Sequence, residues 1–563
     1  MEKIKITALG GLDEEGKDLY CIEVNGDLFV VNGGFKYPDK NAPGIDFIIA
    51  NTSYLEENKD RVKAYILTKT KCQNFGAVPY VYKKAPAPIY CTIFTKDALI
   101  DFSKQIQQDN NYDFNVINVP SSFNIAGHIF DVFGTCSSVV GTFGFSLRTS
   151  LGNVVYSGDF IVEYSNEKYF SLDLNTLGKI AEYPTLVLMT DSVNATKPGY
   201  CSPSHKILPI LSDFFKQANS RIFVALNSDN LYNFNEFFTI ADLTDKKVCF
   251  YNEMAKNIFL KYRDVFCGGR FNPRNIIEAE DVLRSKASDV VILISEDGEK
   301  LYDEISLLIN QESKVKQIKI LPTDMFIMAC PPSDKNEVVF TSTIDDLYKC
   351  GCDVRYISRK SLSKIHAFEE DLKMISSLLK PKYYMPIEGY YVDLLANAKL
   401  AFNMHIGLSH TNIFLLDNGQ SLVIDDHGAT FDSNNDDKIK VGDVMIDGIG
   451  VGDVVKDIIS DRTRLSEDGV VILGCAISKK QKKIICGPDI QMRGFLFLKD
   501  KEADVLIKEI TKIFIDGVNN WISSTSNFNN KIPEAQITQQ ISRLLLRGNN
   551  RNPVIRPNII VLD

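Results

Sequence analysis

The chain has 563 residues, of which 45% are hydrophobic and 24% are charged, and its net charge is −9. A single hydrophobic core rarely organises so long a chain, so the length predicts two to four domains. The acidic balance argues against a protein that coats nucleic acid over its whole surface, but it allows RNA in a local basic groove.

Targeting signals and metal-binding cysteine pairs are absent from the sequence. No apolar run approaches the roughly 20 residues of a membrane span, and the first residues, MEKIKITALGG, contain no signal-peptide core. The twelve cysteines include no CxxC pair, which argues against a structural zinc knuckle and favours reduced, buried thiols. We therefore expect a cytoplasmic protein without a membrane partner.

The first 205 residues alternate short β-strands with helices. Asn25 and Gly26 separate the apolar runs LYCIEV and DLFVVN, a pattern that predicts a β-hairpin. A helix is expected within residues 202–220, with Ser202 or Ser204 as its N-cap. Further strands are expected at AYILT (64–68), NVVYSGDF (153–160) and TLVLMTDS (185–192).

Residues 206–355 repeat a strand–helix rhythm. The strands are the continuous apolar runs RIFVAL, KKVCFY, DVVILIS and DMFIMA, which are typical of a buried, largely parallel sheet. A helix at 367–381 and a strand at 382–389 follow. The polar stretch FDSNNDDK (431–438) predicts a linker, and the order strand, strand, helix, helix, strand beyond it predicts a small α+β domain.

Several motifs together resemble one known family. They are ALGGLDEEGKDLYCIEV (8–24), GIDFIIANTSYLEENKDRVKAYILT (44–68), GAVPY (76–80), YSGDF (156–160), TDSVNATKPGYCSPS (190–204), HAFEEDLKMISSLLKPKYYMPIEGYY (366–391), VMIDGIGVGDV (444–454), DRTRLSEDGVV (461–471) and GPDIQMRGF (487–495). In this order and spacing they resemble the ribonuclease J family, bacterial nucleases of the β-CASP and metallo-β-lactamase fold. The resemblance runs nearly end to end.

The resemblance implies a split α/β architecture. An αββα metallo-β-lactamase sandwich would be formed by residues 1–205 and 356–430, and a β-CASP α/β domain would be inserted at 206–355. A linker at 431–444 would lead to a small C-terminal α+β domain at 445–563. The family degrades or matures RNA as a 5′-to-3′ exonuclease and an endonuclease, using two zinc ions. It assembles as dimers or tetramers, sometimes between unequal paralogues.

The family's zinc ligands are mostly replaced in this chain. Two-metal hydrolysis needs neutral imidazoles and carboxylates, which the family supplies from an H-x-H-x-D-H loop and from later loops. Asp159 is kept, but lysines and amides stand at the positions of the H-x-H-x-D-H loop. A protonated lysine repels zinc, and amides are weak ligands. The resemblance therefore implies no bound metal, no cofactor and no confident catalytic residue. The vestigial positions are Lys69, Lys71, Gln73, Asn74, Ser137, Asp159 and Glu388, with Asn32 at a changed strand-end aspartate.

The family's phosphate-gripping motif, H-x-S-G-H, is also altered. It corresponds here to Leu362, Ser363, Lys364, Ile365 and His366, so that the last histidine alone is kept. Lys364 could contact a phosphate, but a solvated surface lysine is the simpler interpretation. Asp191 is kept as well and is expected to order its own loop.

Loss of two zinc ions would leave Asp159, Asp191 and Glu388 facing one another in a partly buried cleft, which is costly. A lysine could supply the missing positive charge. Our hypothesis is that Lys69 or Lys71 forms a salt bridge with Asp159 or Glu388 in place of metal.

The sequence thus favours a ribonuclease-J-like protein of RNA processing or decay that is inactive or strongly impaired. It would act as partner subunit of an active paralogue in a hetero-oligomer, as a homodimer, or as an RNA-associated scaffold. One alternative is an active nuclease whose atypical metal site draws on Asp159, Glu388 and Cys72. Another is a structural protein without RNA contact, which the acidic Glu296 and Asp297 favour.

Overall fold

The chain forms two compact units, and each is considered by itself. The first consists of Met1–Lys36 and Ile49–Asp443, and the second of Tyr37–Ile48 and Val444–Asp563. The predicted domain borders inside the first unit remain predictions, and residues 432–438 of the predicted linker lie outside the described residues. The computed structural model describes residues 2–38, 42–108, 110–164, 168–313, 315–431, 439–448, 450–452, 456–495, 500–524 and 534–562.

Two β-sheets pack face to face in the first unit. One has eight strands in the order β22-β21-β1-β2-β3-β6-β7-β8, and the other has six in the order β20-β13-β12-β11-β10-β9. Apolar side chains of both sheets share one core. Within it the rings of Phe29 and Phe130 meet edge to face with their centroids 5.1 Å apart. Burial of this apolar surface is the main force that holds the sheets together.

The strands of the first sheet are β1 (Ile4–Gly10), β2 (Leu19–Val24), β3 (Asp27–Asn32), β6 (Val62–Leu67), β7 (Ile89–Cys91), β8 (Phe114–Val116), β21 (Ser421–Asp425) and β22 (Gly428–Phe431). Those of the second sheet are β9 (Ser121–Ile125), β10 (His128–Gly134), β11 (Phe143–Thr149), β12 (Gly152–Tyr156), β13 (Thr185–Asp191) and β20 (Tyr383–Ile387).

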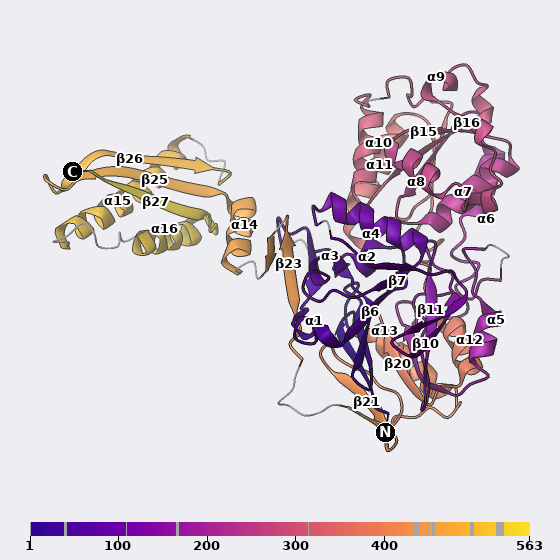
Figure 1. The fold of residues 1–563 in the computed structure, drawn as a ribbon. Helices are drawn as coiled ribbons and strands as arrows, with labels where there is room; N and C mark the ends of the chain where they lie inside the picture. Colours follow the sequence, from indigo (N-terminus) through magenta and orange to yellow (C-terminus); the bar gives the residue numbers. More distant parts are fainter. Residues whose placement is uncertain are drawn as a thin grey trace. The chain divides into compact units, whose positions relative to one another are not determined.

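Helices complete the sandwich. The outer face of the second sheet is covered by α5, α12 and α13, whose apolar residues join a second core. Every residue of β3 after the first is buried, so the first sheet is covered on both faces. The predicted αββα fold class is therefore confirmed (Figure 1). The helices that flank the two sheets are α1 (Ser53–Glu57), α2 (Cys72–Phe75), α3 (Val78–Val81), α4 (Ile93–Gln105), α5 (Leu174–Ile180), α12 (Glu369–Leu379) and α13 (Tyr391–Asn403).

The hairpin predicted at Asn25-Gly26 joins β2 to β3. Both residues adopt positive φ angles, 52° and 98°. These angles match the two-residue turn that the right-handed twist of the strands favours. The dipeptide therefore sets the register in which β2 pairs with β3.

A third sheet lies in the segment expected to hold the inserted domain, and all of its strand pairs are parallel, as predicted. Apolar side chains form one core on each face. In order across the sheet, the strands are β16 (Ile276–Ile277), β15 (Lys247–Phe250), β17 (Val290–Glu296), β14 (Ile222–Asn227), β18 (Met325–Met328) and β19 (Asp353–Tyr356). Its helices are α6 (Leu208–Gln217), α7 (Leu231–Leu243), α8 (Glu253–Tyr262), α9 (Ala279–Val282), α10 (Lys300–Ile309) and α11 (Glu337–Lys349).

The expected N-cap of α6 is wrong. The helix begins at Leu208, beyond Ser202 and Ser204, and no side chain of its own N-cap residue closes it. Instead Oε2 of Glu236 in α7 accepts hydrogen bonds from the amides of Ile207 and Leu208. A tertiary contact thus satisfies the free amides of this helix.

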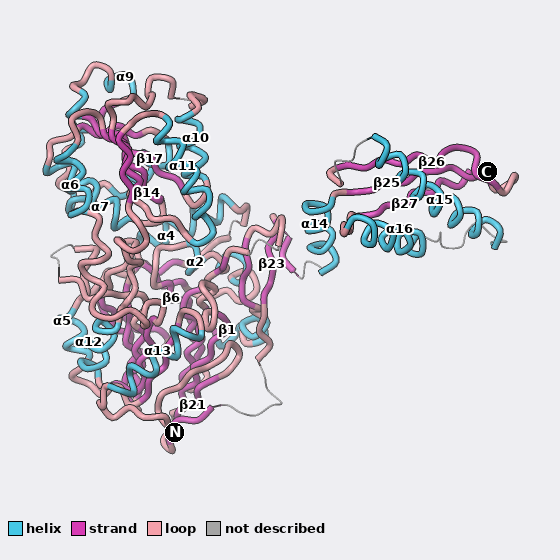
Figure 2. Tube along the Cα trace, turned by 180° about the vertical axis from the view of Figure 1, so that it is seen from behind, coloured by secondary structure: helices cyan, strands magenta, loops and turns pink. Residues whose placement is uncertain are grey.

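From residue 470 onward the second unit has the predicted strand, strand, helix, helix, strand order, and two short strands and a helix that the prediction did not include precede it. Its sheet, β26-β25-β27, packs one face against α15 and α16 (Figure 2). Its elements are β23 (Asp443–Asp447), β24 (Gly450–Gly452), α14 (Lys456–Asp468), β25 (Val470–Ser478), β26 (Lys483–Arg493), α15 (Asp500–Ser524), α16 (Glu534–Asn549) and β27 (Val554–Leu562), and the remaining short strands of the chain are β4 (Phe35–Lys36) and β5 (Phe47–Ala50).

Residues 37–48 belong to the second unit, although residues 49–443 of the first unit separate them in sequence from the rest of it. The amide of Asp46 donates to the carbonyl of Ile446, and Arg462 pairs with Asp447 and donates to the carbonyl of Gly44. Among the described residues, none of the helices combines the length and apolar character needed to cross a bilayer.

Candidate functional site

Several of the predicted site positions come together where strands of both sheets end. Asn32 is the last residue of β3, and Lys69 follows the parallel strand β6. Asp159 follows β12, Asp191 ends β13 and Glu388 follows β20, three strands that are parallel neighbours. The ends of neighbouring parallel strands share one edge of a sheet, which is where α/β proteins usually place their ligand sites.

A buried ion pair joins the two sheets. The ammonium of Lys69 contacts Oδ2 of Asp159, and their side chains are 8% and 2% exposed. Burial, reinforced by the charge of Lys71, lowers the pKa of Lys69 to about 8. The ammonium therefore remains the main form at pH 7. The salt bridge that we hypothesised is present, with Lys69 and Asp159 as its partners.

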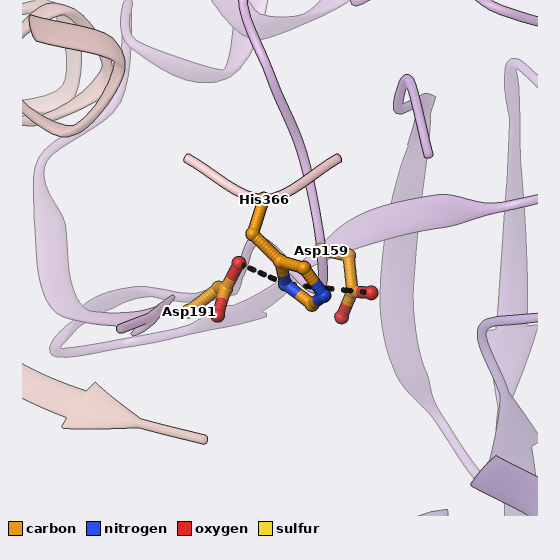
Figure 3. A group of neighbouring side chains, drawn as sticks. All are labelled: Asp159, Asp191 and His366. Carbon is orange, nitrogen blue, oxygen red and sulfur yellow. Dashed lines mark hydrogen bonds and ion pairs between the residues drawn. The ribbon is translucent and has the colours of Figure 1, made fainter. Parts of the chain in front are cut away.

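A second contact links Asp191 to His366. The Nδ1 atom of His366 lies 2.8 Å from Oδ2 of Asp191 and 3.8 Å from Oδ2 of Asp159. Figure 3 shows the imidazole between the two carboxylates. The other oxygen of Asp191 accepts a hydrogen bond from the amide of Val193. Asp191 thus orders its own loop, as expected, and also orients His366.

A third contact chain runs through Tyr156. The hydroxyl of Tyr156 donates to Oε1 of Glu388 at 3.1 Å and accepts from Nδ2 of Asn32 at 3.0 Å. Burial, followed by the charge of Asp191, raises the pKa of Glu388 to about 7. Glu388 has a φ of 58°, a strained conformation for a residue other than glycine, and such strain is concentrated at functional sites.

Asp18 completes the cluster, and the sequence analysis missed it. Its Oδ2 accepts a hydrogen bond from Nδ2 of Asn74 at 2.8 Å. Burial, followed by the charge of Glu388, raises its pKa well above the usual value. The loops meet so closely that a Cβ atom on Gly34 would lie 2.2 Å from the carbonyl oxygen of Gln73, so this position requires glycine. The available signal was the acidic segment DEEGKD just before β2.

Two of the vestigial positions form no hydrogen bond or ion pair with this cluster among the described residues. The ammonium of Lys71 lies 3.5 Å from Oδ2 of Asp229, in the inserted segment. The side chain of Ser137 is fully buried, and its hydroxyl has no hydrogen-bond partner among the described residues. The neighbouring carbonyl of Ser138 accepts from the amide of Tyr232 in α7.

The segment 362–366 contributes one side chain to the cluster. Leu362 and Ile365 are buried in a core of the first unit, and the amide of Ser363 donates to the carbonyl of Ser204. Lys364 is largely exposed, with its ammonium 3.1 Å from Oε1 of Glu15. This geometry favours the interpretation of Lys364 as a surface lysine, and His366 alone reaches the carboxylates.

The cluster does not fit two zinc ions. Such a centre needs several neutral imidazoles, and here one imidazole stands beside an ammonium that contacts the retained aspartate. Burial raises the pKa of Cys72 to about 11 and that of Cys136 well above its usual value, and neither thiol belongs to the group of close ligand atoms among the described residues. Among the described residues, Asp159, Asp191 and His366 form a group whose ligand atoms all lie within 4.8 Å of one another.

Comparison with known proteins gives full-length relatives. The chain is 30% identical over 569 residues to ribonuclease J2 of Bacillus subtilis (strain 168), and the match covers 99% of both chains. It is 29% identical over 568 residues to ribonuclease J 2 of Streptococcus pyogenes serotype M3, covering all of both chains. A family model described as the ribonuclease J C-terminal domain matches residues 457–562.

A solved structure shares the fold. The crystal structure of a protein of unknown function from Enterococcus faecalis V583 superposes with a TM-score of 0.52 and 14% sequence identity. The match covers 75% of this chain and all of the other. At this identity the likeness concerns the fold alone.

Proposed function

The chain belongs to the ribonuclease J family, and from this premise we propose that it serves RNA processing or decay without the family's two-zinc chemistry. In this role it is catalytically inactive or strongly impaired. It acts as partner subunit of an active ribonuclease J paralogue, or as a scaffold that holds RNA.

One observation carries the proposal, namely the Lys69 ammonium on Asp159. Asp159 is the retained ligand of the sequence motif, and a cationic side chain already neutralises it. A buried ammonium in contact with Asp159 repels a divalent cation that approaches the same carboxylate. The Coulomb energy between such charges in a partly buried site reaches several kcal/mol. The loops stay joined without metal, so the scaffold persists while the hydrolytic centre is lost.

The partner role has its own support. The relatives match the chain over its whole length, and the family model covers nearly all of the second unit beyond β24. That unit keeps its own apolar core between α15, α16 and the sheet β26-β25-β27. A chain that had lost every role would not be expected to preserve this module.

The test uses the pure full-length chain and a 5′-monophosphorylated RNA. We expect no decay with Mn²⁺, Mg²⁺ or Zn²⁺ present. Co-expression with the active paralogue of the same cell is expected to yield a hetero-oligomer on size-exclusion chromatography with light scattering, and to change the paralogue's decay rate. If the chain forms no complex with the paralogue and binds no RNA, the proposal is contradicted. That result favours a structural protein without RNA contact.

A second candidate function is a nuclease with an atypical metal site. The observation that favours it is the group of Asp159, Asp191 and His366. The site that we expected for this alternative drew on Asp159, Glu388 and Cys72, and of these only Asp159 belongs to the group of close ligand atoms among the described residues. Metal-dependent RNA decay that disappears in Asp159→Ala would establish this candidate in place of the first.

A further inference from the structure

The cluster holds more acid than its single ammonium neutralises. The carboxyl groups of Glu388, Asp18 and Asp191 all act on Lys69 electrostatically, in addition to its contact with Asp159. Each of these acids is buried. Buried carboxyl groups are costly unless paired or protonated, so we expect this cluster to favour positive charge beyond one lysine.

Three of the groups have the spacing of ligands to one cation. Nδ1 of His366 lies 2.8 Å from Oδ2 of Asp191 and 3.8 Å from Oδ2 of Asp159. Ligand atoms held about 2.0–2.1 Å from one tetrahedral metal ion lie roughly 3.3 Å from one another. The two measured separations fall on either side of this value, and Figure 3 shows the imidazole of His366 between the two carboxylates.

The ammonium of Lys69 contacts the oxygen that such a cation would need. Its partner is Oδ2 of Asp159, the same atom that faces His366. We propose that Asp159, Asp191 and His366 form a latent site for one divalent cation, which Lys69 keeps closed by placing its ammonium on Asp159. This inference rests on the proposed loss of the two-zinc centre.

The ligand set indicates which cations the opened site would take. One imidazole nitrogen and two carboxylate oxygens suit Mn²⁺ and Zn²⁺ better than Ca²⁺, which prefers six to eight oxygen ligands. The carboxylates come from the ends of two adjacent parallel strands, β12 and β13. His366 is held by its contact with Asp191, so we expect removal of the lysine charge to leave the three atoms near their positions.

The test is metal binding by the full-length variant Lys69→Met, which removes the charge and keeps most of the side-chain volume. Calorimetric titration with Mn²⁺ or Zn²⁺ alone is expected to give one site per chain. Its affinity should exceed that of the wild type by roughly a hundredfold or more, since the opposing charge is gone. The double variant Lys69→Met/Asp159→Asn should lose this site.

Lys71→Met is the matched control. It removes the same charge two residues along the loop, from a lysine whose partner is Asp229. It leaves the ammonium on Asp159, so it should not open the site. Lys69→Ala provides a second opening variant, and circular dichroism verifies that each variant is folded.

Two results would overturn the inference. In the first, wild type and Lys69→Met bind the metal equally well, so that the lysine does not block the site. In the second, neither folded opening variant gains a metal. Because the readout is binding of the ion, it is independent of whether the chain joins a paralogue or retains RNA, and failure of the proposed function would be seen separately.

Discussion

Two buried ion pairs of the first unit differ in what surrounds them. Arg221 and Asp324 form a two-pronged pair, with Nε to Oδ1 at 3.0 Å and Nη2 to Oδ2 at 2.6 Å. The amide of Leu321 adds a hydrogen bond to the same carboxylate. Every charge of this pair is matched, so the pair ties together the start of β14 and the turn before β18.

Lys69 and Asp159 form the contrasting pair. A single point charge contacts one oxygen, and further acids stand beside it. Burial and the charge of Lys71 lower the pKa of Lys69 to about 8, although the neighbouring acids oppose this shift. Burial and the charge of Asp191 raise the pKa of Glu388 to about 7. Two ion pairs that are equally buried can therefore differ in how well the surrounding groups balance their charges. The arginine pair is a fully matched contact, whereas the lysine pair lies within a larger group of buried acids.

The largest expected effect comes from breaking the arginine pair. Asp324→Asn leaves Arg221 charged and without its carboxylate in a buried position, which is expected to lower the free energy of unfolding by about 4 kcal/mol. Urea denaturation of the full chain measures it. Asp281→Asn is the control, because its pair with Arg284 is exposed and should contribute less than about 1 kcal/mol. Similar losses in both variants would contradict the comparison.

Breaking the lysine pair should cost less. Lys69→Met leaves Asp159 unpaired, but a carboxylate can take up a proton, whereas a guanidinium cannot release one. We expect a loss of about 2–3 kcal/mol, measured as above, and most of it should return in Lys69→Met/Asp159→Asn. Lys71→Met should change stability by less than about 1 kcal/mol. A double variant no more stable than the single one would argue against a direct pair.

The acid surplus predicts a pH dependence. Since the pKa of Glu388 is raised to about 7 in the folded chain, the folded state holds this proton more tightly than the unfolded state. Its contribution is fully present below about pH 4.5 and is lost as the pH rises through about 7, at up to ~1.4 kcal/mol per pH unit.

Unfolding free energies of wild type and Glu388→Gln, measured between pH 5 and 7, test this prediction. The variant should show a shallower fall with pH, and Glu280→Gln, which changes an exposed carboxyl, should follow the wild type. Parallel curves for wild type and Glu388→Gln would contradict a raised pKa of Glu388 in the folded chain.

The smallest effect is expected at Lys364. Its contact with Glu15 is exposed, so Lys364→Ala should change the free energy of unfolding by less than about 0.5 kcal/mol. Binding of a 5′-phosphorylated RNA, measured by fluorescence anisotropy, should stay within about twofold of the wild type if this lysine is a surface group. A much larger loss of affinity would restore the phosphate-binding role that the motif position suggests.

Local patterns determined much of the fold. Asn25 and Gly26 specify the hairpin between β2 and β3 because few other residues adopt two successive positive φ angles. The continuous apolar runs after residue 220 specify buried parallel strands because both faces of such a sheet are covered. The start of α6 was not predictable in this way, since Glu236 of another helix closes it.

For the site, the resemblance of the sequence to the family predicted that the zinc-binding residue types are replaced and that Asp159 is retained. It also supplied the electrostatic reason to expect a lysine beside Asp159 or Glu388. It could not decide which lysine, because Lys69 and Lys71 are two positions apart in one loop. The tertiary structure decided this by placing Asp159 beside one and Asp229 beside the other. Long-range strand order likewise brought Asp18, Tyr156 and His366 to the cluster. No local pattern encodes such contacts, which depend on how separate strand ends meet in space.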